Sequence, residues 1–462
     1  MRRLMLLLVP VALFAQQVVV DTVIRVPSSV GNACFFPELN KLYVDNYPDG
    51  YFVLDCSTYQ SKPEIPTRAW LIHYSWDWRD QKLYVTDYAG PESTLVVDVA
   101  ADSVNGWLAV YREWRWDAYL SDIDARFKPA VDTLYEYDCR NDSITRRLPI
   151  HSTCASWDSV GRKLYVGQGS MKRLYVYDYL RDSCLKVIDV SAIPATLPDA
   201  CVFSRTYRRA YVSSEQIDIG PDNVGILDTD RDTLLRVLPV RILNGMYRQV
   251  VVNDRDGKAY LIDCDGRYDH PDTMWVVDCA TDSVLKKFEC APESANADAC
   301  VRWVPWSNRI YLISELGIAG SSLVVIDCNT DSVIVSGMLR GGMLYDIQLD
   351  PIGRRIFVTG DTDKVFVLHD SGYAAVQETP SAEGRAMNVS PTIVHGVLSL
   401  RGATSHKFRA ASLLDISGRQ VVALKPGAND VSRVSPGVYF VRSEPSAVSR
   451  QPSAVTKVVV TR

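Results

Sequence analysis

A unit of 40 to 50 residues repeats along most of the chain, and this repeat constrains the fold more than any other feature of the sequence. Each copy has a cationic residue and a short apolar run with an aromatic ring, as in Lys41 to Val44 and Lys258 to Leu261. A second apolar run ends in an aspartate, and these aspartates are Asp55, Asp98, Asp138, Asp178, Asp228, Asp278 and Asp327. Such a period, with several short strands in each unit, predicts the blades of a β-propeller.

Each unit is expected to form four short strands. The first strand region carries a recurrent cysteine, at Cys34, Cys154, Cys201 and Cys300. The turn between the third and fourth strands is rich in Asp, Asn and Thr, whose short side chains bond back to the backbone and fix tight hairpins. The third strand is apolar on both faces, as in Leu323 to Ile326, which indicates that each blade lies between two neighbours.

The two ends of the repeat region predict how the ring closes. The last unit has Val365 to Leu368 as its third strand and His369 in place of the aspartate, and it runs into a Ser/Pro/Glu/Gly-rich segment without a fourth strand. The missing strand is found near the N-terminus, where Asp21 to Val26 matches Asp232 to Val237 of an internal unit. We expect the N-terminal strand to complete the last blade, which would remove an open sheet edge.

The number of blades rests on the third unit. The repeat count gives eight units, but the third has a degenerate second strand near Arg126 and Phe127. That unit is either a distorted blade or an insertion in a seven-bladed ring. The count favours eight.

The recurrent Lys-Leu-Tyr-Val and Val-Val-Asp-x-x-Thr-Asp-Ser-Val segments resemble the repeats of YVTN-type β-propellers, which are related to the seven-bladed lactonase-like superfamily. The resemblance covers residues 18–375. It implies a propeller for this segment and little about function, because the matching residues are structural.

A second domain follows the repeats. Residues 376–386 are rich in Ser, Pro, Glu and Gly and are predicted to form a linker, and residues 387–462 are predicted to form a small Ig-like β-sandwich. Its expected strands are Ile393 to Leu400, Phe408 to Ile416, Gln420 to Leu424, Val438 to Arg442 and Lys457 to Thr461.

Three segments of this domain, Leu413 to Val421, Pro436 to Arg442 and Lys457 to Arg462, resemble the Por-type C-terminal domain of type IX secretion and its FlgD-like immunoglobulin relatives. The resemblance implies a sorting domain that contacts the secretion machinery for outer-membrane export and often for surface attachment. The chain departs from the family by an additional Ser/Pro-rich stretch, Glu444 to Val455. The alternative is an Ig-like accessory module that stabilises or spaces the propeller.

Residues 1–15 are predicted to be a signal peptide. Arg2 and Arg3 give the positive start, Leu4 to Phe14 the apolar segment, and Ala15 a small residue at the cleavage point. The apolar run is too short to span a bilayer, and no later stretch is long enough. We therefore expect an exported protein, extracellular or on the outer cell surface and periplasmic in transit, without a transmembrane segment. The alternative is a cytoplasmic protein with an apolar first strand.

The overall charge excludes nucleic acid as a main partner. The chain has 50 Lys and Arg against 55 Asp and Glu, a formal net charge of −5, so it lacks the positive field with which such proteins neutralise phosphates. The 24 tyrosines and 10 tryptophans, together with abundant Val, Ile and Thr, favour strands over helices. The expected fold class is all-β.

The sequence assigns no residue to catalysis, cofactor binding or metal binding. The six histidines form no pair at metal-ligand spacing, and neither a Gly-x-Ser-x-Gly elbow nor a Gly-rich phosphate loop is present. Calcium is the ion that two acidic stretches could bind, at Asn253 to Gly257 and at Asp263 to Asp269. Asp/Gly clusters of this kind are also ordinary turns.

Cysteines and tryptophans have structural and functional interpretations. A further set of cysteines follows the third-strand aspartate, at Cys56, Cys139, Cys279 and Cys328, and this repeat equivalence favours packing between blades over redox chemistry. Several tryptophans concentrate in the second and third units, at Trp70, Trp76, Trp78, Trp114 and Trp116. They could fill wedges between blades or stack on sugars or peptides at one face.

Two functions fit these observations. The first is a secreted or cell-surface propeller that acts as a non-enzymatic binding or scaffold module for a protein or glycan partner. The alternative is a lactonase-like or other hydrolase with its site at the mouth of the central channel, which would need His, Glu, Asp or Asn converging from several first strands. Aromatic and neutral polar side chains at that mouth would favour binding.

Overall fold

The computed structural model describes the following residues of the 462-residue chain: 18–26, 31–46, 50–62, 64–67, 74–86, 93–109, 118–129, 133–150, 152, 154–168, 172–193, 197–215, 224–240, 250–263, 271–291, 300–315, 320–339, 342, 344–360, 363–370, 392–395, 397–400, 408–414, 419–425, 427–431, 434, 437–445 and 455–461. The chain divides into two compact units, residues 1–374 and 375–462. The predicted signal peptide at 1–15 and linker at 376–386 lie outside the described residues.

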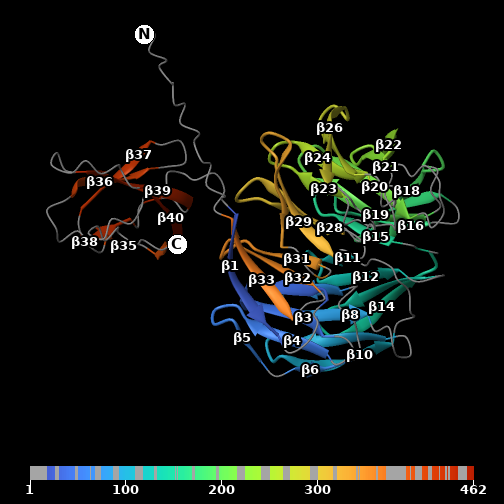
Figure 1. Ribbon diagram of the computed structural model, residues 1–462, viewed down its shortest axis with the longest axis horizontal. Coiled ribbons are helices and arrows are strands. Elements are labelled where there is room, and N and C mark those ends of the chain that lie inside the picture. The colour runs from blue at the N-terminus through green and yellow to red at the C-terminus, as the bar shows by residue number, and fades with distance from the viewer. Residues whose placement is uncertain are drawn as a thin grey trace, which may run out of the picture. The chain divides into compact units, whose positions relative to one another are not determined.

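The described part of the first unit is an eight-bladed β-propeller of antiparallel sheets (Figure 1). Six blades have four strands in sequence order, blade 1 has an additional short strand, and blade 8 takes its fourth strand from the N-terminal segment. Blade 1 contains β2 (Ala33–Phe36), β3 (Lys41–Asn46), β4 (Gly50–Asp55), β5 (Gln60–Ser61) and the short β6 (Ile65–Pro66), which also pairs with β4. Blade 2 contains β7 (Tyr74–Asp77), β8 (Lys82–Thr86), β9 (Ser93–Asp98) and β10 (Ser103–Ala109). Blade 3 contains β11 (Ala118–Leu120), β12 (Ala125–Pro129), β13 (Leu134–Asp138) and β14 (Ser143–Leu148). Blade 4 contains β15 (Cys154–Asp158), β16 (Lys163–Gln168), β17 (Arg173–Asp178) and β18 (Ser183–Asp189).

The remaining blades repeat this plan. Blade 5 contains β19 (Leu197–Ser204), β20 (Arg209–Glu215), β21 (Val224–Asp228) and β22 (Thr233–Leu238). Blade 6 contains β23 (Val250–Asn253), β24 (Lys258–Asp263), β25 (Asp272–Asp278) and β26 (Val284–Ala291). Blade 7 contains β27 (Val301–Val304), β28 (Arg309–Glu315), β29 (Ser321–Asp327) and β30 (Ser332–Met338). Blade 8 contains β31 (Leu344–Asp350), β32 (Arg355–Gly360), β33 (Lys364–Asp370) and, as its fourth strand, β1 (Val18–Arg25).

The predicted count of eight is therefore confirmed. The degenerate third unit forms a complete four-stranded blade and is not an insertion in a seven-bladed ring. Its second strand, β12, pairs with β11 and β13 although it lacks the usual Lys-Leu-Tyr-Val sequence. No helix occurs among the described residues, and so none there has the length and hydrophobicity that crossing a membrane requires.

Closure by the N-terminal strand is also confirmed, but in a different register. β1 pairs antiparallel with β33 from Val18, opposite Asp370, to Arg25, opposite Lys364. Asp21 lies at a bulge, at the place of Leu235 in β22, so the sequence match between Asp21 and Asp232 is shifted by three residues. The bulge lies at the same place in both strands, so it identifies the equivalent residues, which the sequence similarity does not.

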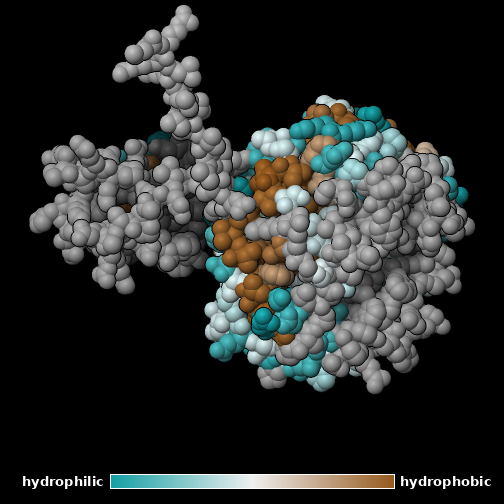
Figure 2. All heavy atoms as spheres, viewed as in Figure 1, coloured by the Kyte–Doolittle hydropathy of each residue, from teal (hydrophilic) through white to brown (hydrophobic). Residues whose placement is uncertain are grey.

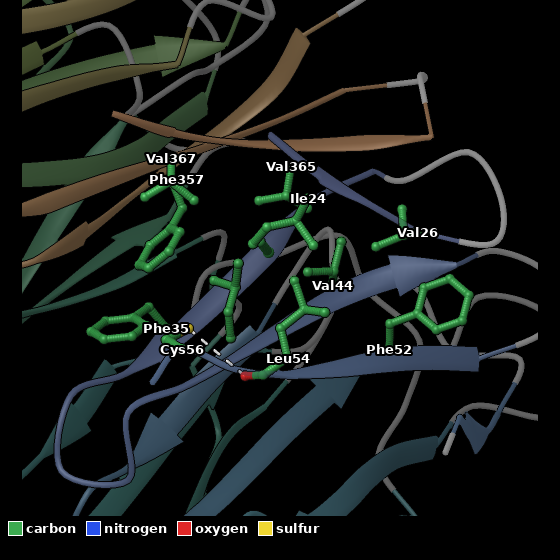
Figure 3. Packing of buried hydrophobic residues seen from close by; sticks show 12 residues of the cluster. Ile24, Val26, Phe35, Val44, Phe52, Leu54, Cys56, Phe357, Val365 and Val367 are labelled. Carbon is green, nitrogen blue, oxygen red and sulfur yellow. Dashed lines mark hydrogen bonds between the residues drawn. The ribbon is translucent and has the colours of Figure 1, made fainter. Parts of the chain in front are cut away.

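Apolar packing holds the closing joint. Ile24 and Val26 of the N-terminal segment pack with Val365 on β33 and with Val44 and Leu54 of blade 1 (Figure 3). All five side chains are buried. Other clusters join each further pair of neighbouring blades in the same way, so burial of both faces of the central strands stabilises the ring.

The fourth strands form the outer rim and expose apolar side chains. These residues are Val19, Val23, Val104, Trp107, Leu185, Val187, Leu235, Leu285 and Ile334. In Figure 2, hydrophobic residues gather on the visible face of the propeller where β1 and β29 lie. Long cations on the same rim reach the next blade: Lys186 donates to the Arg231 carbonyl at 2.9 Å and Arg236 to the Asp282 carbonyl at 2.9 Å.

The second unit contains a five-stranded and a two-stranded sheet, consistent with a small β-sandwich. Its strands are β34 (Thr392–His395), β35 (Val397–Leu400), β36 (Phe408–Leu414), β37 (Gln420–Leu424), β38 (Gly427–Asp430), β39 (Gly437–Pro445) and β40 (Val455–Thr461). The larger sheet has the order β34-β40-β39-β36-β37, and β35 pairs with β38. The expected single strand Ile393 to Leu400 is thus two strands in different sheets, and β38 was not predicted.

Candidate functional site

The residues that define the repeat connect one blade to the next. The cation at the start of the second strand and the tyrosine two residues later reach an aspartate in the turn before the fourth strand of the following blade. In blade 6, Lys258 Nζ lies 2.7 Å from Asp331 Oδ2, and the Tyr260 hydroxyl donates to Asp331 Oδ1 at 2.7 Å. Lys258 also donates to the Cys328 carbonyl at 3.1 Å. We call this arrangement the inter-blade latch.

Among the described residues, the ion pair of the latch occurs at six of the eight joints between blades. The pairs are Lys41–Asp102, Lys82–Asp142, Lys163–Asp232, Arg209–Asp282, Lys258–Asp331 and Arg309–Asp370. Asp370 is exceptional among these aspartates because it does not lie in the turn before a fourth strand. In blade 8 Val18 of β1 takes that position, and Asp370 at the end of β33 supplies the carboxylate. The other five have φ between 49° and 58°, which aspartate tolerates better than most residues.

Burial and hydrogen bonding act against each other on the latch carboxylates. Burial raises the pKa of Asp102, but hydrogen bonds from Lys41, Lys62 and Tyr43 outweigh it, so the pKa lies below the ordinary value. Burial, with the hydrogen bond to Asp102, raises the pKa of Tyr43 well above its ordinary value. This latch therefore holds a charged carboxylate and a neutral phenol at neutral pH.

The joint after blade 3 replaces the latch with other contacts. Ala125 and Phe127 stand where other blades have the cation and the tyrosine. Arg146 on β14 supplies the charge instead, pairing with Asp182 of blade 4 at 2.9 Å and with Glu136 of its own blade. The repeat residues are therefore structural, and a functional site must be sought where blades depart from the repeat.

Asp346 on β31 is the centre of one such departure. Neighbouring first strands contact one another around the middle of the ring, and Asp346 is fully buried there. It accepts hydrogen bonds from the Ala33 backbone amide at 3.2 Å and from Gln348 Nε2 at 2.8 Å. The Cys300 thiol lies 3.4 Å and the Arg302 guanidinium 3.6 Å from its Oδ1 atom.

Gln348 extends this group to a fourth blade. Its Nε2 atom lies 2.9 Å from the Tyr74 hydroxyl of blade 2, while its Oε1 atom accepts from the Phe35 amide of blade 1 at 3.3 Å. Side chains of blades 7, 8, 1 and 2 therefore meet at the inner strands. We call Tyr74, Arg302, Asp346 and Gln348, with Cys34 and Cys300, the channel cluster.

The channel cluster is better suited to binding than to proton transfer. Five groups engage the Asp346 carboxylate and hold it in place: the four named above and the Ile347 backbone amide, which donates to it at 2.8 Å. Burial, and next the negative charge of Asp346, raise the pKa of Cys34 well above its ordinary value, so this cysteine is a neutral thiol at neutral pH and a poor nucleophile. The cluster offers a guanidinium, an amide and a phenol as its polar groups.

One group of metal-ligating side chains occurs among the described residues, at another place. Atoms of Asp77, Asp124 and Cys139 lie within 4.8 Å of one another, and all three residues are buried. They belong to the joint between blades 2 and 3. None of them was singled out for metal binding from the sequence.

In the described parts of the two acidic stretches that could bind calcium, the aspartates accept hydrogen bonds from other side chains of the propeller. Asp254 accepts from the Ser204 hydroxyl at 2.6 Å, and Asp256 accepts from Asn308 Nδ2 at 2.7 Å. Asp263 accepts from the Trp275 indole at 3.1 Å, and residues 264–269 lie outside the described part of the chain. Calcium binding there stays a prediction.

The tryptophans separate into two groups. Trp76 packs edge-to-face on Phe36 of blade 1, with ring centroids 5.2 Å apart, and so fills a wedge between blades. Trp78 is exposed, with the Arg79 guanidinium 5.4 Å from its ring. Trp70, Trp114 and Trp116 lie outside the described residues.

The cysteines that the structure describes are free thiols. Nine of these ten are buried, and Cys184 alone among them is exposed. Cys56 is representative: its thiol lies 3.8 Å from the Leu54 carbonyl (Figure 3), and burial raises its pKa to about 12. This agrees with the packing role inferred from repeat equivalence. His369, at the aspartate position of the last repeat, is exposed.

Neither the channel cluster nor the carboxylate pair was found by searching for motifs. Arg302, Asp346 and Gln348 lie on first strands, where the recurrent cysteine is the shared feature and these three residues do not recur. An aligned set of the eight units would have revealed Asp77 and Asp124, because no other unit places two carboxylates at the same two positions. Departures from the repeat are thus the useful signal.

The fold defines the class of protein as an eight-bladed β-propeller. No family model matches the chain, and no curated protein matches its sequence. Among solved structures 1505 chains match, so the fold by itself specifies no single activity. One match is described as "Dihydro-heme d1 dehydrogenase NirN in complex with DHE", with a TM-score of 0.60 and 16% identity over 76% of each chain. At this identity the likeness concerns the fold alone.

Proposed function

We propose that the protein is an exported β-propeller that binds a protein or glycan partner at the end of its central channel, without catalysing a reaction. The channel cluster carries the proposal. It brings the polar side chains of Tyr74, Arg302 and Gln348 together from three blades, on strands fixed by the latches. A rigid scaffold with converging donors binds a polar ligand at low entropic cost.

The composition of the inner strands favours binding over hydrolysis. The described first strands contain no His and no Glu. The aspartates Asp158 and Asp350, at the ends of β15 and β31, are held by Arg208 and Arg355. Most of the half-buried aromatic residues on the same strands, among them Trp76, Trp157, Phe203 and Trp303, pack in the clusters between blades. Tyr74 and Tyr345 are half-buried on the same strands, and rings of this kind stack on sugars and pack on peptides.

Delivery to the cell exterior is the second part of the proposal. The predicted signal peptide, residues 1–15, supports export, and the resemblance of residues 387–462 to the Por-type domain supports outer-membrane sorting through the type IX machinery. The YVTN-type repeats fit this picture, since the propeller would then act as the displayed binding module.

Glycan and surface-protein arrays test the binding role. We expect the mature chain to bind a small set of ligands, and Arg302→Ala to weaken that binding at least tenfold. Arg181→Ala is the matched control, because the Arg181 side chain is 82% exposed on the outer part of blade 4. Tyr74→Phe, which removes a single hydroxyl, gives a second variant should Arg302→Ala fold poorly.

A hydrolase site at the channel mouth is the competing outcome. Turnover of lactone or phosphoester substrates by the mature chain, abolished in both channel variants and kept in the control, would replace the binding proposal. Arrays without any hit, or with hits that all variants retain equally, would also overturn it.

A further inference from the structure

Two positions meet at the joints between blades. The last residue of a first strand faces the residue that precedes the second strand of the next blade. Between blades 4 and 5 these are Asp158 and Arg208, joined by two hydrogen bonds of 2.7 and 3.0 Å. Between blades 6 and 7 they are Asn253 and Asn308, 2.9 Å apart. These two pairs are thus of opposite charge or neutral, and no other joint in the described part of the ring places two carboxylates at these positions.

Between blades 2 and 3 the same two positions hold Asp77 and Asp124. Asp77 is 0% and Asp124 7% exposed. The Tyr119 hydroxyl lies 2.6 Å from Asp77 Oδ1 and 2.9 Å from Asp124 Oδ1. A hydroxyl has one proton to donate, so it satisfies only one of the two carboxylates at a time.

No cation of the described residues pairs with either carboxylate. The ammonium of Lys82 binds Asp142 and the Cys139 carbonyl, and the Arg126 guanidinium lies over the Tyr84 ring at 4.9 Å. The Arg79 guanidinium lies over Trp78. Two buried carboxylates that no cation of the described residues pairs with are strongly unfavourable, and a bound cation or a shared proton offsets their charge.

The second observation that points to a ligand is an orphaned oxygen. Asp77 Oδ2 is buried and has no hydrogen-bond partner, whereas Oδ1 accepts from Tyr119 and from the Arg79 backbone amide at 2.8 Å. A ligating atom of each of Asp77, Asp124 and Cys139 lies within 4.8 Å of the others, a spread that a single metal ion can span.

We propose that Asp77, Asp124 and Cys139 bind a divalent metal ion of the zinc class, which ties blade 2 to blade 3. The thiol selects a borderline metal over calcium or magnesium, which take oxygen ligands. The Cys139 proton passes to solvent when the thiolate binds. Tyr119, beside both carboxylates, or a water molecule can supply the fourth ligand. The site is structural and goes beyond the proposed channel function.

The test is metal analysis of the full mature chain, loaded with Zn²⁺ or Co²⁺ and then freed of excess by gel filtration. The double variant Asp77→Asn/Asp124→Asn copies the Asn253–Asn308 pair of blades 6 and 7, so the ring itself shows that it can fold. Cys139→Ser removes the thiol. Cys328→Ser is the matched control, because Cys328 holds the repeat-equivalent position in blade 7 without a carboxylate pair.

We expect one metal ion per chain in the unmodified protein and in Cys328→Ser. We expect at least a tenfold loss of metal in the double variant and in Cys139→Ser. The Co²⁺ form should show a thiolate-to-cobalt charge-transfer band that Cys139→Ser lacks, and strong chelators should lower the melting temperature of the unmodified protein but not of the double variant.

Two results would overturn the proposal. One is a protein without metal after loading whose double variant is more stable than the unmodified chain near neutral pH, which would show that the carboxylates share a proton instead. The other is equal metal content in Cys139→Ser and Cys328→Ser, which would place the metal elsewhere.

Discussion

Replacing Asp331 with Asn breaks the ion pair of one latch and leaves most of its geometry in place. Asn tolerates the positive φ of 49° at this position and still accepts the hydrogen bond from Tyr260. Lys258 loses a carboxylate at 2.7 Å and keeps the Cys328 carbonyl. The two charged side chains are only 17% and 15% exposed, so water replaces the lost contact poorly.

The expected cost follows from these contacts. A hydrogen bond to a charged group contributes about 1.5–3 kcal/mol, and partial exposure moves the value toward the lower end. We expect Asp331→Asn to lower the free energy of unfolding by about 2 kcal/mol in urea denaturation. In a double-mutant cycle with Lys258→Met, the coupling energy should be about 1–2 kcal/mol.

An exposed ion pair is the control for this prediction. Arg25 and Asp363 lie 2.9 Å apart, but their side chains are 75% and 43% exposed. Asp363→Asn should therefore cost less than about 0.5 kcal/mol. Equal costs for Asp331→Asn and Asp363→Asn would refute the idea that the latches stabilise the ring.

Two further predictions concern pH and closure. Hydrogen bonds from Lys41 to Asp102 and from Arg208 to Asp158 outweigh burial and lower the pKa of both carboxyls, so the free energy of unfolding should hold steady above the unfolded pKa of about 4 and fall as the pH drops below it. Burial raises the pKa of latch tyrosines such as Tyr165, so the free energy of unfolding should hold steady below about pH 10 and fall above it. Urea titrations from pH 2 to 11 measure both trends. A flat profile would contradict the inferences about the carboxyls and the tyrosines. Deleting residues 18–25 removes the fourth strand of blade 8, so calorimetry should show a large decrease in melting temperature. Deletion of residues 1–17 is the control and should cause no such decrease. Similar melting curves for the two deletions would contradict closure by β1.

The propeller could be predicted from the sequence because its information is local and repeated. The cation, the tyrosine and the third-strand aspartate recur at nearly constant spacing, and the doubly apolar third strands indicate sheets buried on both faces. Closure followed from counting strands at the two ends of the repeat.

Register and partner choice could not be predicted in the same way. The match of Asp21 to Asp232 compared sequences, whereas the observed pairing places Val18 at the position of Asp232. The latch carboxylate therefore comes from Asp370. The contact of Gln348 with Tyr74 joins residues 274 positions apart, on strands that share no repeat pattern. β38 was missed because Gly427 to Asp430 has the composition of a turn.

Binding without turnover at the channel is tested most directly by calorimetric titration of an array-selected ligand, followed by mass spectrometry of the recovered ligand. We predict that one ligand binds per chain, that it is recovered unchanged, and that Arg302→Ala weakens binding at least tenfold, or about 1.4 kcal/mol, while Arg181→Ala does not. A ligand recovered as product, or an affinity that Arg302→Ala leaves unaltered, would contradict the proposed function.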